Sequence, residues 1–261
     1  MDAELRDDNG LTEEEFLKQY DPDRYEKPAV TADMLIFTAD PAKDFVLELL
    51  MIQRKGHPYI GKWAIPGGFV EMNESVDAAA ARELEEETGL KDIYMEQLYT
   101  FGEVERDPRM RVISVAYMAL LAKDRLKPVA GDDAAAVRWF TVHWDDKNGR
   151  DRLWLESEDG TIILQEDDIA FDHEQVIKTA LRRLRNKVEY TDIAFELVGE
   201  TFTLTKLQTI YESILGRELH KPNFRRSIAR QVEKTDQKER GGASRPAYLY
   251  RKKEMEVSRY E

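Results

Sequence analysis

Three glutamates spaced within one helical turn form the strongest chemical signal in this sequence. Glu83, Glu86 and Glu87 occupy positions i, i+3 and i+4 in the run RELEEETGL. A helix advances by about 100° per residue, so it would bring all three side chains to one face. Neighbouring carboxylates repel one another, and a hard dication that prefers oxygen ligands, water and phosphate relieves that repulsion. The spacing therefore predicts a metal-pyrophosphate site with Mg²⁺ as the cation and Mn²⁺ as the alternative.

The glutamates belong to a longer pattern that begins at Gly68 and ends at Leu90. This segment fits G-x5-E-x7-R-E-U-x-E-E-x-G-U, in which U is aliphatic, at every fixed position. Arg82 precedes Glu86 by four residues, where its guanidinium can hold a carboxylate through charge-assisted hydrogen bonds. Gly67 and Gly68 let the backbone turn and approach a ligand closely. The pattern indicates a site in which Arg82 supports the three glutamates.

A solvated helix surface is the competing explanation for these glutamates. Ala- and Glu-rich surface helices are common, and RELEEE by itself would fit one. The glycine turn, Glu74 and Gly89 at their fixed offsets favour a functional site instead. Glu74 lies near the expected helix start, where unpaired amides stabilise a negative charge, so a structural and a catalytic role both stay open for it.

Residues outside this segment offer weaker signals. Arg54 ends an expected strand and could reach a substrate phosphate, although an exposed arginine explains it equally well. Asp132 and Asp133 are candidate general bases on a later loop, and a turn before a strand is the alternative. The four histidines lack metal-ligand spacing and receive no role: His57, His143, His173 and His220.

Composition predicts an ordinary globular protein. The chain has 261 residues, of which 42% are hydrophobic, enough for a buried core. No apolar run approaches the roughly 20 residues that span a bilayer, and the N-terminus is acidic. We therefore expect a soluble, unsecreted, cytoplasmic protein without a membrane partner. The absence of cysteine excludes disulfides and thiolate metal sites.

The net charge of -13 is divided unevenly along the chain. Residues 201–261 contain 14 Lys and Arg against 8 Asp and Glu, a net of +6, which leaves 25 basic and 44 acidic residues in 1–200, a net of -19. Basic modules attract polyanions and acidic ones repel them, so this division suggests two modules with different partners. A solvated basic tail is the alternative.

The coarse secondary structure has the order β-β-α-β-β-β, followed by a second helix. Val76, Ala80 and Leu84 give the first helix an apolar face, and Gly89 is placed to end it. An alternating segment with a turn at 158–160 predicts an inserted hairpin near 150–166. We expect domains at 1–189 and 190–261. The expected strands are 30–39, 45–54, 93–104, 111–122 and 136–142, and the helices are 75–88 and 173–189.

The basic C-terminal segment has the pattern of a helix-turn-helix with a wing. Residues 204–216 have helical apolar spacing that ends at Gly216, and 223–232 would form a second helix. That helix carries Arg225, Arg226 and Arg230, which could enter a major groove of double-stranded DNA. Residues 241–253 offer a loop and a strand, with Arg245 on the wing.

The segment Gly68 to Leu90 resembles the Nudix box, and GKWAIPGGFVE resembles the approach to it. The resemblance implies an α+β protein with an α/β/α sandwich and a mixed sheet. It also implies that Glu83, Glu86, Glu87 and the carbonyl of Gly68 bind metal and that water attacks a nucleoside diphosphate compound. The whole chain resembles Nudix-related transcriptional regulators, which add a small C-terminal winged helix and form homodimers.

Two functions follow from these patterns, and one chain could have both. The first is hydrolysis of ADP-ribose or a related nucleotide by a Mg²⁺-dependent Nudix enzyme, which the complete box favours. The second is DNA-binding regulation, in which the Nudix domain senses ADP-ribose or a sugar-related ligand. A third hypothesis makes the last domain a dimerisation or protein-contact module.

Overall fold

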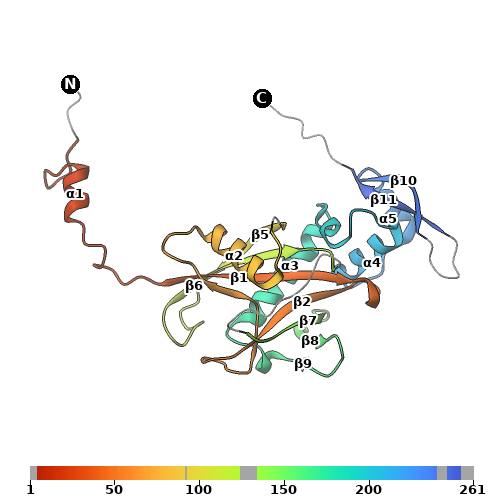
Figure 1. Ribbon diagram of the computed structural model, residues 1–261, viewed down its shortest axis with the longest axis horizontal. Coiled ribbons are helices and arrows are strands. Elements are labelled where there is room, and N and C mark those ends of the chain that lie inside the picture. The colour runs from red at the N-terminus through yellow and green to blue at the C-terminus, as the bar shows by residue number, and fades with distance from the viewer. Residues whose placement is uncertain (1–4, 92, 124–133, 240–245, 254–261) are drawn as a thin grey trace.

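A mixed β-sheet forms the centre of the computed structural model, which describes residues 5–91, 93–123, 134–239 and 246–253 (Figure 1). Its strand order is β5-β6-β1-β2-β7-β8-β9, with short strands β3 and β4 paired to β2 and β1. β1 and β6 run parallel and the other described pairs run antiparallel. The strands are β1 Ala29–Asp40, β2 Val46–Arg54, β3 Trp63–Ala64, β4 Gly67–Phe69, β5 Met95–Phe101, β6 Val112–Leu120, β7 Ala134–Asp145, β8 Arg152–Ser157 and β9 Ile163–Leu164.

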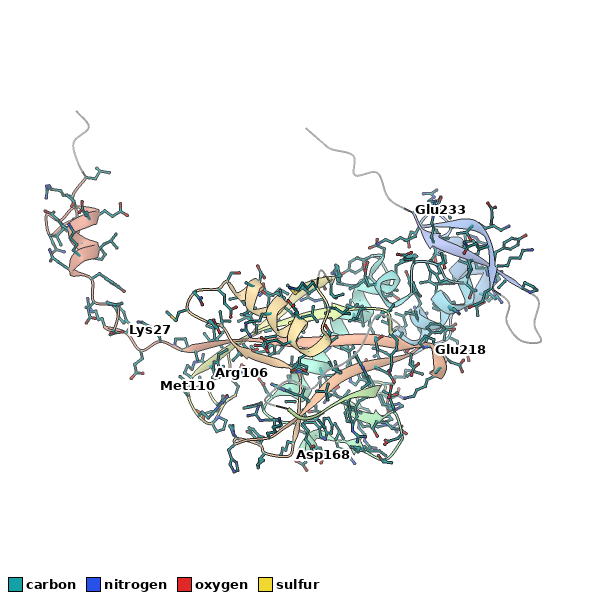
Figure 2. The ribbon with its side chains drawn as sticks, in the orientation of Figure 1. Lys27, Arg106, Met110, Asp168, Glu218 and Glu233 are labelled. Atoms are coloured by element: carbon teal, nitrogen blue, oxygen red, sulfur yellow. The ribbon has the colours of Figure 1, made fainter. Side chains whose placement is uncertain are left out.

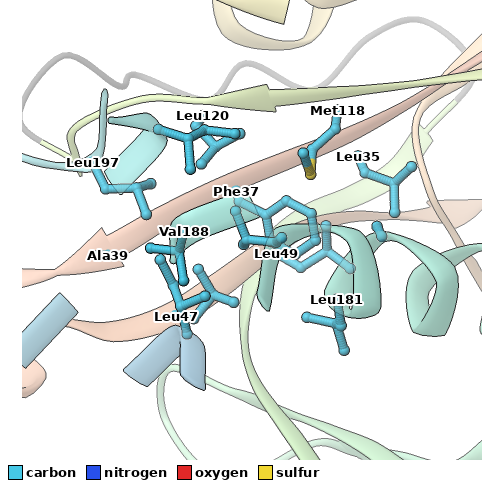
Figure 3. Close-up of a cluster of buried hydrophobic side chains, with 14 of the residues drawn as sticks. Leu35, Phe37, Ala39, Leu47, Leu49, Met118, Leu120, Leu181, Val188 and Leu197 are labelled. Carbon is cyan, nitrogen blue, oxygen red and sulfur yellow. The ribbon is translucent and has the colours of Figure 1, made fainter. Parts of the chain in front are cut away.

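One long helix covers each face of this sheet. The apolar side of α2, Val76–Thr88, packs Ala80 and Leu84 against Met34 of β1 and its neighbours. On the opposite face, α3, His173–Val188, buries Leu181 and Val188 against Phe37 and Leu49 (Figure 3). Successive side chains of β1 point to opposite faces of the sheet, so this strand contributes both to the core under α2 and to the core under α3. The expected α/β/α sandwich is confirmed.

Both ends of α2 are fixed by residues that the sequence pattern contains. The Ser75 hydroxyl accepts a hydrogen bond from the Ala78 amide at 3.1 Å, which satisfies one of the unpaired amides of the first turn. Gly89 adopts φ 70°, and its amide donates to the Glu85 carbonyl at 2.7 Å. A side chain is strained at this φ, so glycine is the residue that can end the helix here.

The alternating segment after β7 forms a hairpin that extends the main sheet. β8 pairs antiparallel with β7, and β9 pairs with β8. The chain turns at Ser157 to Gly160, where the Gly160 amide donates to the Ser157 carbonyl. Lys178 of α3 contacts Asp151 at the start of the hairpin and Glu174 on its own helix. The hairpin is therefore a continuation of the sheet held against α3.

A short helix, α1 (Glu13–Gln19), lies at the end of an extended N-terminal arm (Figure 1). Thr12 and Glu15 form a capping box at its start, which stabilises this single short helix. None of its residues is buried, and Phe16 and Tyr20 contact each other through their rings. Neither α1 nor any other helix in the described part of the chain is long and apolar enough to cross a membrane.

The C-terminal part is a small winged helix. It consists of the 3-10 helix Ile193–Leu197, α4 Leu204–Leu215, α5 Lys221–Ile228 and the antiparallel pair β10 Val232–Glu239 and β11 Ala247–Lys252. Our expected second helix was wrong at its end, because α5 stops at Ile228 and Arg230 lies in the following turn. The helix must stop there since Val232 already pairs with Lys252 in the wing.

The winged helix packs directly against the sheet and α3. The Ser213 hydroxyl of α4 accepts a hydrogen bond from the Leu47 amide of β2 at 2.9 Å. Arg185 of α3 donates through Nε to the Ile214 carbonyl at 3.1 Å and pairs with Asp146 at 2.7 Å. Lys147 reaches the Gly216 carbonyl at 3.2 Å. Cations thus meet the carbonyl end of α4, where the helix dipole favours positive charge.

Candidate functional site

The expected site residues surround a cavity of about 1050 Å³ at one end of the sheet. β1 and the end of β2 supply part of its wall, and α2 supplies a face of carboxylates. The loop before β6 and the residues around the start of α3 close the remaining sides. The cavity lining includes the side chains of Asp33, Arg54, Arg82, Glu83, Glu86, Glu87, Arg106, Asp107, Arg109, Phe171 and His173.

The carboxylate face of α2 is directed into this cavity. Glu83, Glu86 and Glu87 all line it. Glu83 and Glu87 are buried and Glu86 is exposed, so the face runs from the cavity floor to its mouth. Glu85 is absent from the lining and instead pairs with Lys91 at 3.0 Å. The helical spacing brings three of the four glutamates to the cavity and turns the fourth away.

Arg82 binds one carboxylate that precedes α2 and another within it. Its guanidinium donates to Glu74 at 2.9 Å and to Glu83 at 2.7 Å, and it also reaches the Phe69 carbonyl at 3.3 Å. The Glu86 carboxylate, the partner expected from the spacing, is more distant at 3.5 Å. The hydrogen bond from Arg82 lowers the pKa of Glu74. Glu74 therefore serves here to fix Arg82 beside the carboxylate face.

Glu87 is the carboxylate most in need of a positive partner. Its Oε2 atom is buried and has no hydrogen-bond partner. Burial, and then the charges of Glu83 and Glu86, raise its pKa to about 7. Burial also raises the pKa of Glu83. An unpaired buried carboxylate costs free energy, and a bound dication would remove that cost. The donor set of oxygens fits Mg²⁺ or Mn²⁺.

Gly67 and Gly68 allow the backbone to pass between β1 and the carboxylates. A Cβ atom on Gly67 would lie 2.5 Å from the Ala32 carbonyl oxygen and 2.8 Å from the Asp33 carboxylate. A Cβ atom on Gly68 would overlap the Glu83 carboxylate. Both glycines also line the cavity, so any larger residue would displace groups of the site itself.

Two arginines and an aromatic ring form another wall of the cavity. Arg54 lies over the ring of Phe171 at 5.0 Å, and its Nε donates to the Pro58 carbonyl at 2.8 Å. Arg109 lies 5.9 Å from the same ring and donates two hydrogen bonds to Asp107, at 3.0 and 2.8 Å. Those bonds lower the pKa of Asp107. Two oriented guanidinium groups in the same cavity as three carboxylates suit a ligand that carries phosphate, which arginine can bind directly and a metal ion can link to the carboxylates.

A buried polar network adjoins this wall, and no local sequence pattern indicates it. Arg106 donates two hydrogen bonds to Asp172, at 3.0 and 2.8 Å, and lies 3.7 Å from Asp33. Ser114 donates to the Asp33 carboxylate. His173 accepts a hydrogen bond from the Ile65 amide at 3.1 Å, and burial lowers its pKa, so its imidazole is neutral. The network fixes β1, β6 and the start of α3 around the cavity.

A second acidic group lies elsewhere and is already neutralised. In the part of the chain that the structure describes, Asp40, Glu48 and Glu158 are the one group of three or more acidic or histidine side chains whose ligand atoms all lie within 4.8 Å of one another. Lys123 lies among them, 2.6 Å from Glu158, 3.7 Å from Asp40 and in contact with Glu48. Lys43 also pairs with Glu48 at 3.1 Å. These cations satisfy the carboxylates, so the group is a structural ion network.

Some expected site residues are placed away from the cavity or outside the described chain. Asp132 and Asp133, the candidate bases, and Arg245 of the wing lie outside the described residues. Arg225 and Arg226 are exposed on α5, and Arg230 is exposed just after it. The structure therefore separates two sets of functional candidates, one in the cavity and one on the winged helix.

Comparisons with known proteins agree with this division. A model of the NUDIX domain matches residues 27–159, and a model of the NrtR DNA-binding winged helix domain matches residues 194–252. The chain is 37% identical to the ADPR responsive transcriptional repressor NtrR of Acinetobacter baylyi, over 93% of this chain and 89% of the relative. It is also 37% identical to an ADP-ribose pyrophosphatase of Methanocaldococcus jannaschii, over 60% of this chain and 76% of that one.

A solved structure extends the likeness to both domains. The structure is similar to Shewanella oneidensis NrtR complexed with a 27mer DNA, with a TM-score of 0.67, 30% identity, and 86% of this chain and 93% of the other covered. The expected mixed sheet with a C-terminal winged helix is thereby confirmed. The chain belongs to the Nudix family, and within it to the proteins that join a NUDIX domain to an NrtR winged helix domain.

Proposed function

We propose that this protein is a transcriptional regulator that responds to ADP-ribose or a related nucleotide. The observation that carries the proposal is the position of α3, a helix of 16 residues and therefore about 24 Å long. We call the cavity lined by Glu83, Glu86 and Glu87 the nucleotide cavity. At the start of α3, Asp172 holds Arg106 in this cavity. In its last turn, Arg185 holds the Ile214 carbonyl of the winged helix. One rigid element thus contacts both functional regions, and Figure 2 shows Arg106 of the cavity lying apart from Glu218 and Glu233 of the winged helix.

The winged helix carries the charge that DNA binding requires. From Lys221 to Val232 the chain has four basic residues and no acidic one. Arg225 and Arg226 are exposed on the second helix, the element that enters the major groove in helix-turn-helix proteins. Arg230 follows it. We propose these three arginines and Arg245 as the DNA-binding residues, because phosphate neutralisation dominates protein affinity for duplex DNA.

The cavity suits a ligand with a pyrophosphate. Glu83, Glu86 and Glu87, with the Gly68 carbonyl, would hold Mg²⁺ or Mn²⁺, which would neutralise the pyrophosphate. Arg54 and Arg109 on another wall of the cavity would bind its remaining oxygens. The A. baylyi and M. jannaschii relatives carry ADP-ribose in their names, so we propose ADP-ribose as the first ligand to test.

Hydrolysis of that ligand is the second candidate function. The complete box and the unpaired Glu87 oxygen favour it. One of the three glutamates of α2 would help to activate the attacking water beside the metal. Two cleaved products, AMP and ribose 5-phosphate, would then appear.

Fluorescence anisotropy with duplex DNA from upstream of the protein's own gene tests the regulator. We expect binding that weakens as salt rises and a change in affinity when ADP-ribose is added with Mg²⁺. DNA binding that is absent, or that ADP-ribose leaves unchanged, would contradict the proposal. Product analysis of the same mixture tests hydrolysis. If ADP-ribose is still intact after prolonged incubation, the protein binds it without cleaving it.

We also propose that the two domains meet between residues 189 and 190, directly after α3.

A further inference from the structure

A second cavity adjoins the nucleotide site and has an aromatic wall. Its volume is about 540 Å³, and Tyr99 and Phe101 of β5 contribute its rings. The two rings contact each other edge to face, with centroids 5.2 Å apart. Phe101 is only 9% exposed, whereas Tyr99 is 58% exposed. The inner ring is thus fixed by packing, and the outer ring presents surface to the cavity. We call this space the aromatic cavity.

Strand register places the aromatic cavity beside the nucleotide cavity. Asp33 of β1 pairs with Ala116 of β6, and Ala116 pairs with Tyr99 of β5. Residues paired across neighbouring strands lie on the same face of a sheet, and strands are about 4.8 Å apart, so Tyr99 lies roughly 10 Å from Asp33. Asp33 lines the nucleotide cavity. That separation is comparable to the reach of one nucleotide from its phosphate to its base.

An irregularity in β5 sets the direction of Tyr99. The register between β5 and β6 shifts between Gln97 and Tyr99, which leaves an extra residue on β5. Such bulges redirect the side chains that follow them and are frequent beside functional sites. After the shift, Tyr99 and Phe101 are two residues apart and share one face. The bulge therefore brings both rings to the cavity.

Arg106 forms the partition between the two cavities. It lines both of them, and its side chain is 5% exposed. Asp172, to which it donates two hydrogen bonds, lines the aromatic cavity as well. A cation at this position would face the phosphates of a bound nucleotide on one side, while its planar guanidinium bounds the aromatic cavity on the other.

The charges of the aromatic cavity disfavour a second phosphate. Glu103, Glu105 and Asp172 line it against the single cation Arg106. This excess of negative charge disfavours anions, whereas carboxylate oxygens accept hydrogen bonds from uncharged amino groups. Gln175 and Thr179 add an amide and a hydroxyl. A flat, uncharged group with N–H donors matches this lining.

We propose that the aromatic cavity binds the nucleobase of a ligand whose pyrophosphate lies over the carboxylates of α2, with Tyr99 stacked on the base. The inference rests on the proposed function, since it presumes that a nucleotide occupies the first cavity. Base stacking on an aromatic side chain tolerates different bases, while the hydrogen-bonding groups at the edge would favour one with an amino group, such as adenine.

Calorimetry with two probes tests the proposal. One is an ADP-ribose analogue with a methylene group in place of the bridging oxygen, which the protein cannot cleave there, and the other is ribose 5-phosphate, which has no base. We expect Tyr99→Ala to weaken analogue binding roughly tenfold to a hundredfold and to change ribose 5-phosphate binding less than twofold. Tyr99→Trp should retain analogue binding, and Tyr94→Ala, an exposed tyrosine beside the same strand, should behave as the unsubstituted protein.

Each other result overturns the proposal in a distinguishable way. Unchanged analogue binding by Tyr99→Ala would remove the nucleobase subsite and leave the proposed function intact. Equal losses for both probes would assign Tyr99 a structural role. If the unsubstituted protein binds neither probe, the proposed function fails together with the subsite. Thermal unfolding of Tyr99→Ala should match that of the unsubstituted protein, because the side chain is mostly exposed.

Discussion

Gly68 lies so close to Glu83 that a single methyl group on the glycine would overlap the glutamate carboxylate. The carboxylate is already held from the other side by Arg82 at 2.7 Å. It therefore has little room to move away from an added side chain. The strand carrying Gly68 and the helix carrying Glu83 meet at a contact that only glycine permits.

Gly68→Ala should consequently disturb cation binding more than folding. We expect Mg²⁺ or Mn²⁺ affinity to fall roughly 10- to 100-fold, as it does when groups that orient metal ligands are altered. Gly56→Ala is the matched control, because Gly56 lines the same cavity and a Cβ atom there meets nothing within 4 Å. Titration of both variants with Mn²⁺, followed by paramagnetic relaxation, measures the difference. Equal affinities would contradict the assigned role of this contact.

Glu87 should make the cation-free protein less stable as pH rises. Its pKa is raised to about 7 from an ordinary value of 4.5, so the folded protein holds a proton that the unfolded chain has released between these pH values. The proton on Glu87 contributes fully to the stability of the folded protein below about pH 4.5, and this contribution is lost as pH rises through about 7. Glu87→Gln removes the charge. At pH 8 we therefore expect its free energy of unfolding to exceed that of the unsubstituted protein by roughly 1–3 kcal/mol.

Denaturant unfolding in chelator at pH 5 and pH 8 measures this effect. The advantage of Glu87→Gln should shrink at pH 5, and excess Mg²⁺ at pH 8 should favour the unsubstituted protein because only it retains the full ligand set. Glu85→Gln is the control, since Glu85 pairs with Lys91 outside the cavity. A stability difference that is the same at both pH values would refute the assignment.

Arg185 should hold the winged helix against the Nudix domain. It donates to the Ile214 carbonyl at 3.1 Å, pairs with Asp146 at 2.7 Å and lies 4.2 Å from the centre of the Trp144 ring. Arg185→Ala removes all three contacts, and we expect it to lower the free energy of unfolding by about 1–3 kcal/mol.

Hydrogen exchange locates that loss in the structure. Amides of α4 should exchange faster in Arg185→Ala, while those of the central strands β1 and β2 should be unchanged. Arg182→Ala is the control, because Arg182 is exposed and lies farther from the Trp144 ring, at 5.7 Å. If α4 exchanges at the same rate in both variants, Arg185 has no role in docking.

Arg225 and Arg226 should account for much of the salt dependence of DNA binding. Each arginine that contacts phosphate contributes about 1 to the slope of log affinity against log salt, so the double alanine variant should bind more weakly and with a shallower slope. Arg24→Ala with Lys27→Ala removes the same charge from the N-terminal arm and should leave the slope unchanged. An unaltered slope in the α5 variant would place the DNA interface elsewhere.

Much of the fold was predictable because its signals are local. The α2 helix carries its own caps in Ser75 and Gly89 and its own apolar face. Strand β10 was missed, since its sequence VEKTDQKE is charged and lacks apolar alternation, and pairing with β11 alone makes it a strand. For the same reason the end of α5 was wrong, because the wing decides where that helix stops.

The site was predictable only where it lies within one segment. The carboxylate face of α2 follows from helical spacing, but the rest of the cavity depends on contacts between distant residues. Arg106 and Asp172 are 66 residues apart, and Arg106 lies between two expected strands, 93–104 and 111–122. Phe171 adopts φ 56°, which its residue type does not predict. Tertiary packing assembles these groups, so no local pattern reports them.

The linkage between nucleotide and DNA is the central claim, and thermodynamic reciprocity tests it most directly. The affinity of the non-cleavable ADP-ribose analogue is measured by calorimetry with the protein alone and with saturating operator DNA. Linked sites predict a change of roughly 5- to 150-fold in the dissociation constant, and an equal factor when DNA binding is measured with saturating analogue. Dissociation constants that agree within error in the two conditions would contradict the account.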